Sequence, residues 1–160
     1  MRLEERNDYH LPAYAILSHR WYDASEEVSF HDVQPGRDLL DKRGWHKLRN
    51  FCQLALRMGF DYAWSDVCCI NKDSTTELST ALNSMYRWYA ESKVCIAYLH
   101  DVSPRARAFA SSEWFFRGWT LQELIAPKNI RFYDSDWQWL GDKSSLLSTY
   151  QMLPASRRRY

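Results

Sequence analysis

The sequence of 160 residues lacks the features that would place a protein in a membrane or on nucleic acid. Its apolar runs stay well below the ~20 residues that a membrane-spanning helix needs, and no signal peptide precedes the fold. Charge is balanced, with 21 Lys and Arg against 20 Asp and Glu, so composition gives no electrostatic case for nucleic acid. We therefore expect a soluble protein with no membrane span and no nucleic-acid partner.

The sequence also lacks the usual signatures of disulfide-rich, metal-binding and dinucleotide-binding proteins. Its 4 cysteines form no secretory framework, and the adjacent Cys68 and Cys69 are poorly placed to bond to each other. Spaced ligand pairs such as CxxC are missing, which argues against zinc with His19 or His100. Neither GxGxxG nor GxxxxGK occurs, so dehydrogenase and P-loop functions are unsupported. We expect a cytoplasmic protein with reduced thiols, no metal and no tightly bound cofactor.

Aromatic residues are abundant, and they gather in three unusual segments. The chain has 8 Trp, 10 Tyr and 7 Phe, which supply large apolar bodies with polar tips. The segments are YAILSHRW at 14–21, WSDVCCIN at 64–71 and RGWTLQELIAP at 117–127. Within the last one, Gly118 costs a helix about 1 kcal/mol relative to alanine. That glycine predicts a close backbone approach or a bend.

Apolar periodicity predicts alternating strands and helices. Short apolar runs predict strands at 13–18, 62–67, 94–99 and 130–133. Helical spacing predicts one helix from Trp45 to Gly59 and another that begins with Ser74 and runs to Tyr89. Residues 111–126 are also expected to be helical, with a break near Gly118. The polar stretch 25–44 is typical of a long loop, and residues 144–160 show no clear pattern.

Strands separated by helices predict an α/β fold, in which a parallel sheet is covered by helices on both faces. Ligands of such sheets bind beyond the carboxyl ends of the strands. The candidate binding residues are therefore those that end or follow the predicted strands: Ser18, His19, Arg20, Trp21, Asp66, Cys68 and the stretch from His100. This topology brings three segments together at one edge of the sheet, and two of them belong to the unusual segments above.

With all three segments in this order, the chain resembles the HET domain of fungal heterokaryon-incompatibility proteins. The resemblance covers roughly residues 11–143 and includes ELSTALNSMYRWY at 77–89. Tyr22, Ser65 and Asn71 depart from the usual residues of the family. The resemblance implies a TIR-like (flavodoxin-like) fold and a role in nonself recognition that leads to cell death, a form of innate immunity. We expect residues 1–160 to form a single domain, which is either free-standing or the N-terminal part of a larger protein.

TIR-like enzymes cleave the bond between nicotinamide and ribose in NAD. If the resemblance extends to this activity, it implies one carboxylate that stabilises the oxocarbenium-like state. A general acid is dispensable, because nicotinamide leaves as a neutral molecule. Glu77 is the first choice, since it opens the helix after the second strand, although a capping box with Ser74 also explains it. Glu123 is the alternative, and its position also suits a capping box with Thr120 or an ion pair with Arg117.

The remaining candidates have structural alternatives of the same kind. Ser18 and His19 offer polar groups to a nucleotide and Trp21 offers a stacking surface, or they form an ordinary turn with a core tryptophan. Asp66 binds a ribose hydroxyl or caps its own loop. Arg117 and Trp119, from the third hallmark segment, complete the predicted nucleotide-contacting set. Cys68 fills core space by default.

Two classes of function follow from the resemblance. In the first, the domain hydrolyses NAD, or a related nucleotide, once copies self-associate. In the second, it is a non-enzymatic death-signalling module that transmits assembly through its surfaces. Both predict self-association, and both are compatible with receptor domains in the same protein.

Overall fold

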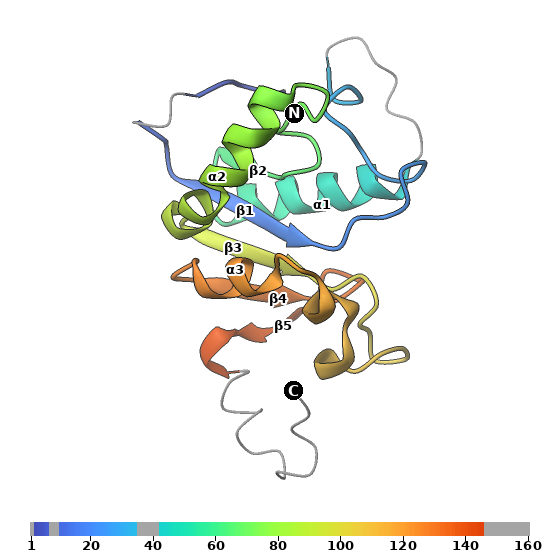
Figure 1. Cartoon of the computed structure of the whole chain (residues 1–160). Helices are drawn as coiled ribbons and strands as arrows, with labels where there is room; N and C mark the ends of the chain where they lie inside the picture. Colours follow the sequence, from blue (N-terminus) through green and yellow to red (C-terminus); the bar gives the residue numbers. More distant parts are fainter. Residues whose placement is uncertain (1, 7–9, 35–41, 146–160) are drawn as a thin grey trace.

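The computed structural model describes residues 2–6, 10–34 and 42–145 of the chain. Its centre is a five-stranded sheet in the order β2-β1-β3-β4-β5. The strands are β1 (Tyr14–His19), β2 (Tyr62–Trp64), β3 (Val94–Tyr98), β4 (Ile130–Tyr133) and β5 (Trp139–Asp142). β1 to β4 pair in parallel, whereas β5 pairs antiparallel to β4. The predicted parallel α/β sheet is therefore confirmed, with one added antiparallel edge strand (Figure 1).

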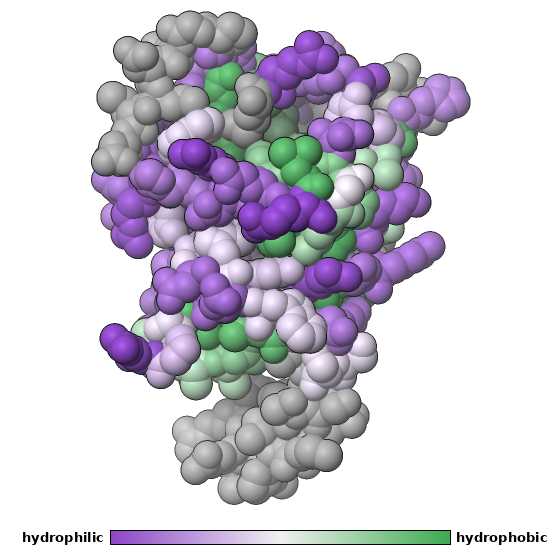
Figure 2. Space-filling model, turned by 180° about the vertical axis from the view of Figure 1, so that it is seen from behind, coloured by the Kyte–Doolittle hydropathy of each residue, from purple (hydrophilic) through white to green (hydrophobic). Residues whose placement is uncertain are grey.

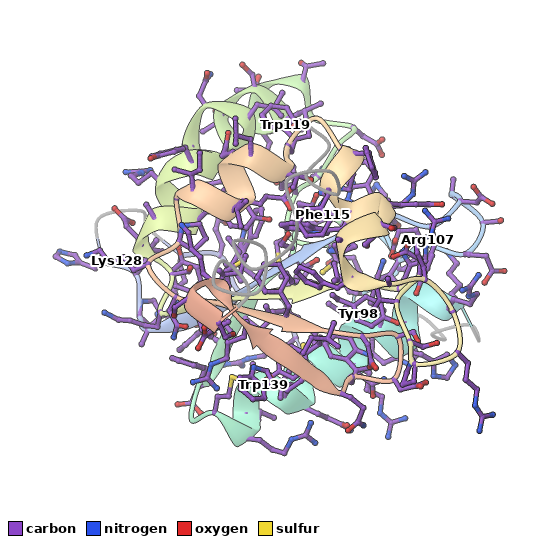
Figure 3. The ribbon with its side chains drawn as sticks, turned by 90° about the horizontal axis from the view of Figure 1, so that it is seen from below. Tyr98, Arg107, Phe115, Trp119, Lys128 and Trp139 are labelled. Atoms are coloured by element: carbon purple, nitrogen blue, oxygen red, sulfur yellow. The ribbon has the colours of Figure 1, made fainter. Side chains whose placement is uncertain are left out.

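Helices cover both faces of this sheet. The helices α1 (Arg43–Arg57) and α2 (Thr75–Glu91) each connect two parallel strands, and α3 (Thr120–Ile125) precedes β4. Figure 3 shows α2 and α3 on one side of the strands and α1 on the other. Each face has its own buried cluster: Ala15 and Leu17 of β1 pack with residues of α1, while Tyr14 and Ile16 pack with residues of α2. This alternation is the two-residue side-chain period of a strand that is buried on both faces.

The segment 111–126 differs from the single broken helix that the sequence predicts. It forms two short 3-10 helices, η1 (Phe109–Ser111) and η2 (Glu113–Phe116), before the six-residue α3. Gly118 lies between η2 and α3, and a Cβ atom built on it meets nothing within 4 Å. The chain bends there, but no backbone approaches closely. The side chain of Trp114, at 1% exposure, belongs to the buried cluster under this segment.

The second predicted strand and the predicted loop at 25–44 have different bounds in the structure. β2 ends at Trp64, so residues 65–67 belong to the turn that follows it. Residues 25–34 form turns, as expected, whereas 35–41 lie outside the described residues. Gly59 ends α1 with φ at 86°, a left-handed conformation that favours glycine.

Candidate functional site

The three unusual segments of the sequence, the hallmark segments at 14–21, 64–71 and 117–127, meet at the carboxyl edge of the parallel strands. Ser18 and His19 end β1, Asp66 follows β2, and Arg117 and Glu123 flank the start of α3. Side-chain contacts across 105 positions of sequence join the first segment to the third, and contacts across 45 positions join it to the second. The edge that the sequence predicted is therefore where these residues lie.

A buried polar network joins β1 to α3. Ser18 donates a hydrogen bond to Glu123 and accepts one from the indole Nε1 of Trp114 at 2.8 Å. Arg117 holds both carboxylate oxygens of Glu123, at 2.9 Å and 2.7 Å. Ser18 and Glu123 are almost without exposure, at 0% and 1%. Because a bidentate guanidinium–carboxylate pair is geometrically specific, this network fixes α3 against the end of β1.

The predicted ion pair of Arg117 and Glu123 is thus confirmed, whereas the predicted capping box of Thr120 with Glu123 is wrong. Trp119 occupies the N-cap position of α3 and makes no side-chain cap. The hydroxyl of Thr120 donates instead to the backbone oxygen of Trp114. Neither group caps α3, because the Thr120 hydroxyl is bonded to that backbone oxygen and the Glu123 carboxylate to Arg117 and Ser18.

The other capping prediction holds in a modified form. The hydroxyl of Ser74 accepts a hydrogen bond from the backbone N–H of Glu77 at 3.3 Å. The Glu77 carboxylate accepts from the backbone N–H of Asn71 at 2.8 Å, rather than from Ser74 as a capping box requires. Glu77 is exposed at the start of α2, outside the buried network around Glu123.

Trp21 and Asp66 form the open side of the site. The Trp21 indole donates to Asp66 Oδ2 at 2.9 Å, and the Lys72 ammonium lies 3.6 Å from the centre of the Trp21 ring. Trp21 is 48% exposed, so it is not the core tryptophan of the structural alternative. Burial, with a smaller contribution from the negative charge of Glu123, raises the pKa of Asp66 to about 6. This arrangement presents an oriented aromatic ring beside a carboxyl group that titrates near neutral pH.

His19 is the least satisfied group of the site. Its side chain is 1% exposed, and neither ring nitrogen has a hydrogen-bond partner among the described residues. Burial, together with the positive charges of Lys47 and Arg117, holds its pKa well below 6.5. A neutral imidazole with an unused donor and acceptor is suited to bind a small polar group that enters the site.

The other predicted site residues lie around this centre. Arg20 is exposed and pairs with Glu113 at 3.3 Å, and Trp119 is 47% exposed beside Arg117. Cys68 is buried in the cluster between α1 and the sheet, as expected of a core thiol. Tyr22 and His100 contact each other with ring centroids 5.7 Å apart. None of the described residues forms a group of three or more His, Cys, Asp or Glu side chains that could hold a metal ion.

Lys47 is one of four cations, with Arg37, Lys42 and Arg43, that the sequence offers to a pyrophosphate or to a solvated loop, and its burial was not predicted. Lys47 lies at 2% exposure inside the protein, with its ammonium 2.6 Å from Glu27 Oε2 and 4.1 Å from the Tyr22 ring centre. Burial outweighs the attraction of Glu27 and lowers the pKa of Lys47 to about 8. Its position on α1, one residue from the apolar Leu48, was the only available signal, because Glu27 comes from the irregular stretch before the helix.

Comparison with known proteins supports the family resemblance. A family model described as Heterokaryon incompatibility protein (HET) matches residues 14–109. The chain is similar to the Vegetative incompatibility protein HET-E-1 of Podospora anserina, with 42% identity over 168 residues. That similarity covers 91% of this chain and 12% of the relative, so the chain spans a small part of the relative's length. No solved structure matches the chain.

Proposed function

The chain belongs to the heterokaryon-incompatibility (HET) family, and from that premise we propose that it is a cell-death effector domain of fungal nonself recognition that cleaves NAD when copies self-associate. Family membership supports the role in heterokaryon incompatibility. The observation that carries the proposal of catalysis is the meeting of Ser18, Asp66 and Glu123 at the carboxyl edge of the sheet. In open α/β sheets this edge is where ligands bind.

The proposed reaction is the hydrolysis of the glycosidic bond of NAD. The bond between ribose C1′ and the nicotinamide nitrogen breaks, its electron pair leaves with neutral nicotinamide, and water adds to C1′ with release of a proton. A carboxylate near C1′ stabilises the developing oxocarbenium ion. Trp21, tethered by Asp66, supplies a stacking surface, and Asp66 is placed to bind ribose hydroxyls. His19, neutral and buried, binds a polar group of the ligand.

Two glutamates compete for the role of the catalytic carboxylate. Glu123 lies in the buried network, and both its oxygens are held by Arg117. A pyrophosphate also attracts a guanidinium, so substrate phosphate that draws Arg117 away would free Glu123 for catalysis. Glu77 is exposed and needs no such release, but it lies at the start of α2 and bonds to the backbone of Asn71. Burial among the hallmark residues favours Glu123.

A non-enzymatic signalling module is the second candidate. The observation that favours it is a row of exposed large apolar side chains around α3: Phe116 at 79%, Trp119 at 47%, Leu121 at 67% and Ile125 at 54%. Such side chains anchor protein interfaces. In this case the ion pair of Arg117 and Glu123 only holds α3 in place, and neither residue acts on a substrate.

Nicotinamide release from NAD separates these candidates. The chain and its Glu77→Gln, Glu123→Gln and Glu91→Gln variants are incubated with NAD at low and high protein concentration. Glu91, an exposed glutamate at the other end of α2, is the matched control for Glu77. We expect release that rises steeply with protein concentration, is retained by Glu77→Gln and Glu91→Gln and is lost in Glu123→Gln.

The fold of each variant is checked by thermal unfolding before its activity is interpreted. Loss of release in a folded Glu77→Gln alone assigns the catalytic carboxylate to Glu77 instead. If the unsubstituted chain releases no nicotinamide while sedimentation shows that it has assembled, NAD cleavage is refuted and the signalling module remains.

A further inference from the structure

Two neighbouring thiols lie in the turn that follows β2. The sulfur atoms of Cys68 and Cys69 are 4.0 Å apart. Cys68 is buried at 3% exposure and its thiol lies 3.9 Å from the backbone oxygen of Ser65, whereas Cys69 is partly exposed. The backbone N–H of Ser65 donates to the Cys69 sulfur at 3.4 Å. Cys69 is therefore the more accessible residue of the pair, and it packs against the same buried cluster that contains Cys68.

Their surroundings give the two thiols unequal reactivity. Either thiol can donate in the sulfur–sulfur contact. With Cys68 as the donor, this hydrogen bond, helped by the Ser65 N–H and opposed by burial, lowers the pKa of Cys69. The same hydrogen bond and burial raise the pKa of Cys68. Cys52, which packs nearby in the same cluster, has its pKa raised to about 11, chiefly by burial. Because the thiolate is the reactive form, Cys69 is the nucleophile and Cys68 is the thiol poised to react next.

We propose that Cys68 and Cys69 are a redox-active dithiol, which a hydroperoxide converts into a disulfide between adjacent residues. The Cys69 thiolate attacks the peroxide, whose O–O bond breaks, to give a sulfenic acid and hydroxide. The Cys68 sulfur then attacks the sulfur of Cys69, and the S–S bond forms as the hydroxyl group leaves with the Cys68 proton as water. In total the two thiols lose two hydrogens, and hydrogen peroxide is reduced to two molecules of water.

The bond so formed is strained, which makes it a reversible modification rather than a structural crosslink. Adjacent Cα atoms lie ~3.8 Å apart, below the ~4.4–6.8 Å that disulfides usually span. Strained disulfides have high reduction potentials and are reduced readily. Strain therefore makes a disulfide between adjacent cysteines less stable, but it does not prevent the bond from forming.

Closure of the disulfide changes the turn that carries Asp66. In the reduced protein the backbone N–H groups of Cys68 and Cys69 donate to the Ser65 oxygen at 3.3 Å and 2.9 Å. A shorter sulfur–sulfur distance requires new backbone angles at both cysteines, and Asp66 lies inside the same turn. Asp66 holds Trp21, so oxidation alters the open side of the candidate site. The thiol chemistry itself does not depend on the proposed NAD cleavage.

Peptide mapping after oxidation tests the proposal directly. The chain is treated with hydrogen peroxide, its remaining thiols are alkylated, and it is cleaved after Lys and Arg. Cys68 and Cys69 fall together in peptide 58–72, whereas Cys52 falls in 50–57 and Cys95 in 94–105. We expect peptide 58–72 to lose two hydrogens, to resist alkylation and to recover both thiols after dithiothreitol. Unchanged thiols, a stable sulfinic acid on Cys69 or a bond to another peptide would overturn the proposal.

Two further measurements separate a dithiol from a single reactive cysteine. In Cys68→Ser, peroxide should leave Cys69 as a sulfenic acid that dimedone traps, while the Cys52→Ser control should behave as the unsubstituted chain. Phenylarsine oxide needs two thiols within reach, so one equivalent should protect peptide 58–72 of the unsubstituted chain from alkylation. This last measurement needs no variant to fold, and absence of protection refutes the dithiol.

Discussion

At the scale of single residues, the buried imidazole of His19 makes the stability of the folded protein depend on pH. The unfolded chain binds a proton at an ordinary histidine pKa, whereas the folded protein resists protonation because the imidazole is buried near cations. Stability therefore falls as pH drops below about 6.5, with a slope approaching 1.4 kcal/mol per pH unit. The raised pKa of Asp66 acts in the opposite direction, since a folded state that binds a proton more tightly gains stability on acidification.

Comparison with His19→Leu isolates the histidine contribution. We expect the variant to be as stable as the parent at pH 7.5 or about 1 kcal/mol more stable, because it buries no unsatisfied polar atoms. Between pH 7 and pH 5 the free energy of unfolding of the parent should fall relative to the variant. Urea unfolding at several pH values measures both effects, and parallel pH profiles would contradict the burial of a neutral His19.

The buried pair of Lys47 and Glu27 gives a second prediction at this scale. Their side chains are exposed by only 1% and 10%, so removal of one partner leaves a charge in the interior. Lys47→Met should destabilise the protein by about 3–5 kcal/mol. The double variant Lys47→Met with Glu27→Gln should recover most of that loss, as measured by urea unfolding. A double variant no more stable than Lys47→Met would show that the pair contributes by packing rather than by charge.

At the scale of elements, two glycines of similar sequence context differ in what their surroundings permit. Gly44 in the first turn of α1 lies against the preceding stretch, and a Cβ atom there would come within 2.7 Å of the backbone nitrogen of Val28 and 2.9 Å of the Glu26 oxygen. Gly118 has open space around it. We expect Gly44→Ala to destabilise by about 1–3 kcal/mol through overpacking, and Gly118→Ala to change stability little. Thermal unfolding of both variants checks this, and equal effects would contradict it.

The elements that the sequence predicted best are those with strong periodicity. The strand at 130–133 and the long helices α1 and α2 were predicted because buried apolar residues recur at a period set by the backbone. β5 was missed, since only Gly141 of its four residues is buried and the others carry no alternating pattern. The segment 111–126 was predicted to be helical with a break near Gly118, and the turn is there, but the part before it forms two 3-10 helices instead of an α-helix.

The sequence predicts where the candidate site lies, but not the hydrogen bonds that join its residues. Strand ends are readable from sequence, so Ser18, His19 and Asp66 were placed at one edge correctly. That Trp114 donates to Ser18, 96 positions away, depends on packing that no local pattern reports. Glu123 shows both outcomes: its ion pair with Arg117 was predicted, whereas its hydrogen bond from Ser18 of β1 was not. Local spacing predicted the local ion pair, but the contacts with β1 depend on tertiary packing.

At the scale of the whole molecule, exposed apolar residues are distributed unevenly. The face seen in Figure 2 has apolar patches set among polar side chains. The outer side of α3 is different in composition: within residues 118–126 the only charged residue is Glu123, which is buried and paired. None of the helices in the described part of the chain has the length and apolar character that a membrane crossing requires. Large apolar side chains on an uncharged outer surface give α3 the composition of a protein contact.

We expect a second copy of this chain to bind that surface, because an uncharged apolar patch can meet its own copy across a two-fold axis without placing like charges together. We expect the chain to associate at high concentration and Leu121→Glu to weaken that association by at least tenfold, since each contact would then bury two carboxylates. Leu56→Glu is the matched control: Leu56 is exposed to a similar extent, 60% against 67%, but lies on α1 across the sheet. Sedimentation velocity over a range of concentrations measures both variants. Equal association of the two variants would show that α3 is not in the interface. Assembly could then not act on Glu123 through the helix that carries it, although Glu123 lies on the inner side of α3.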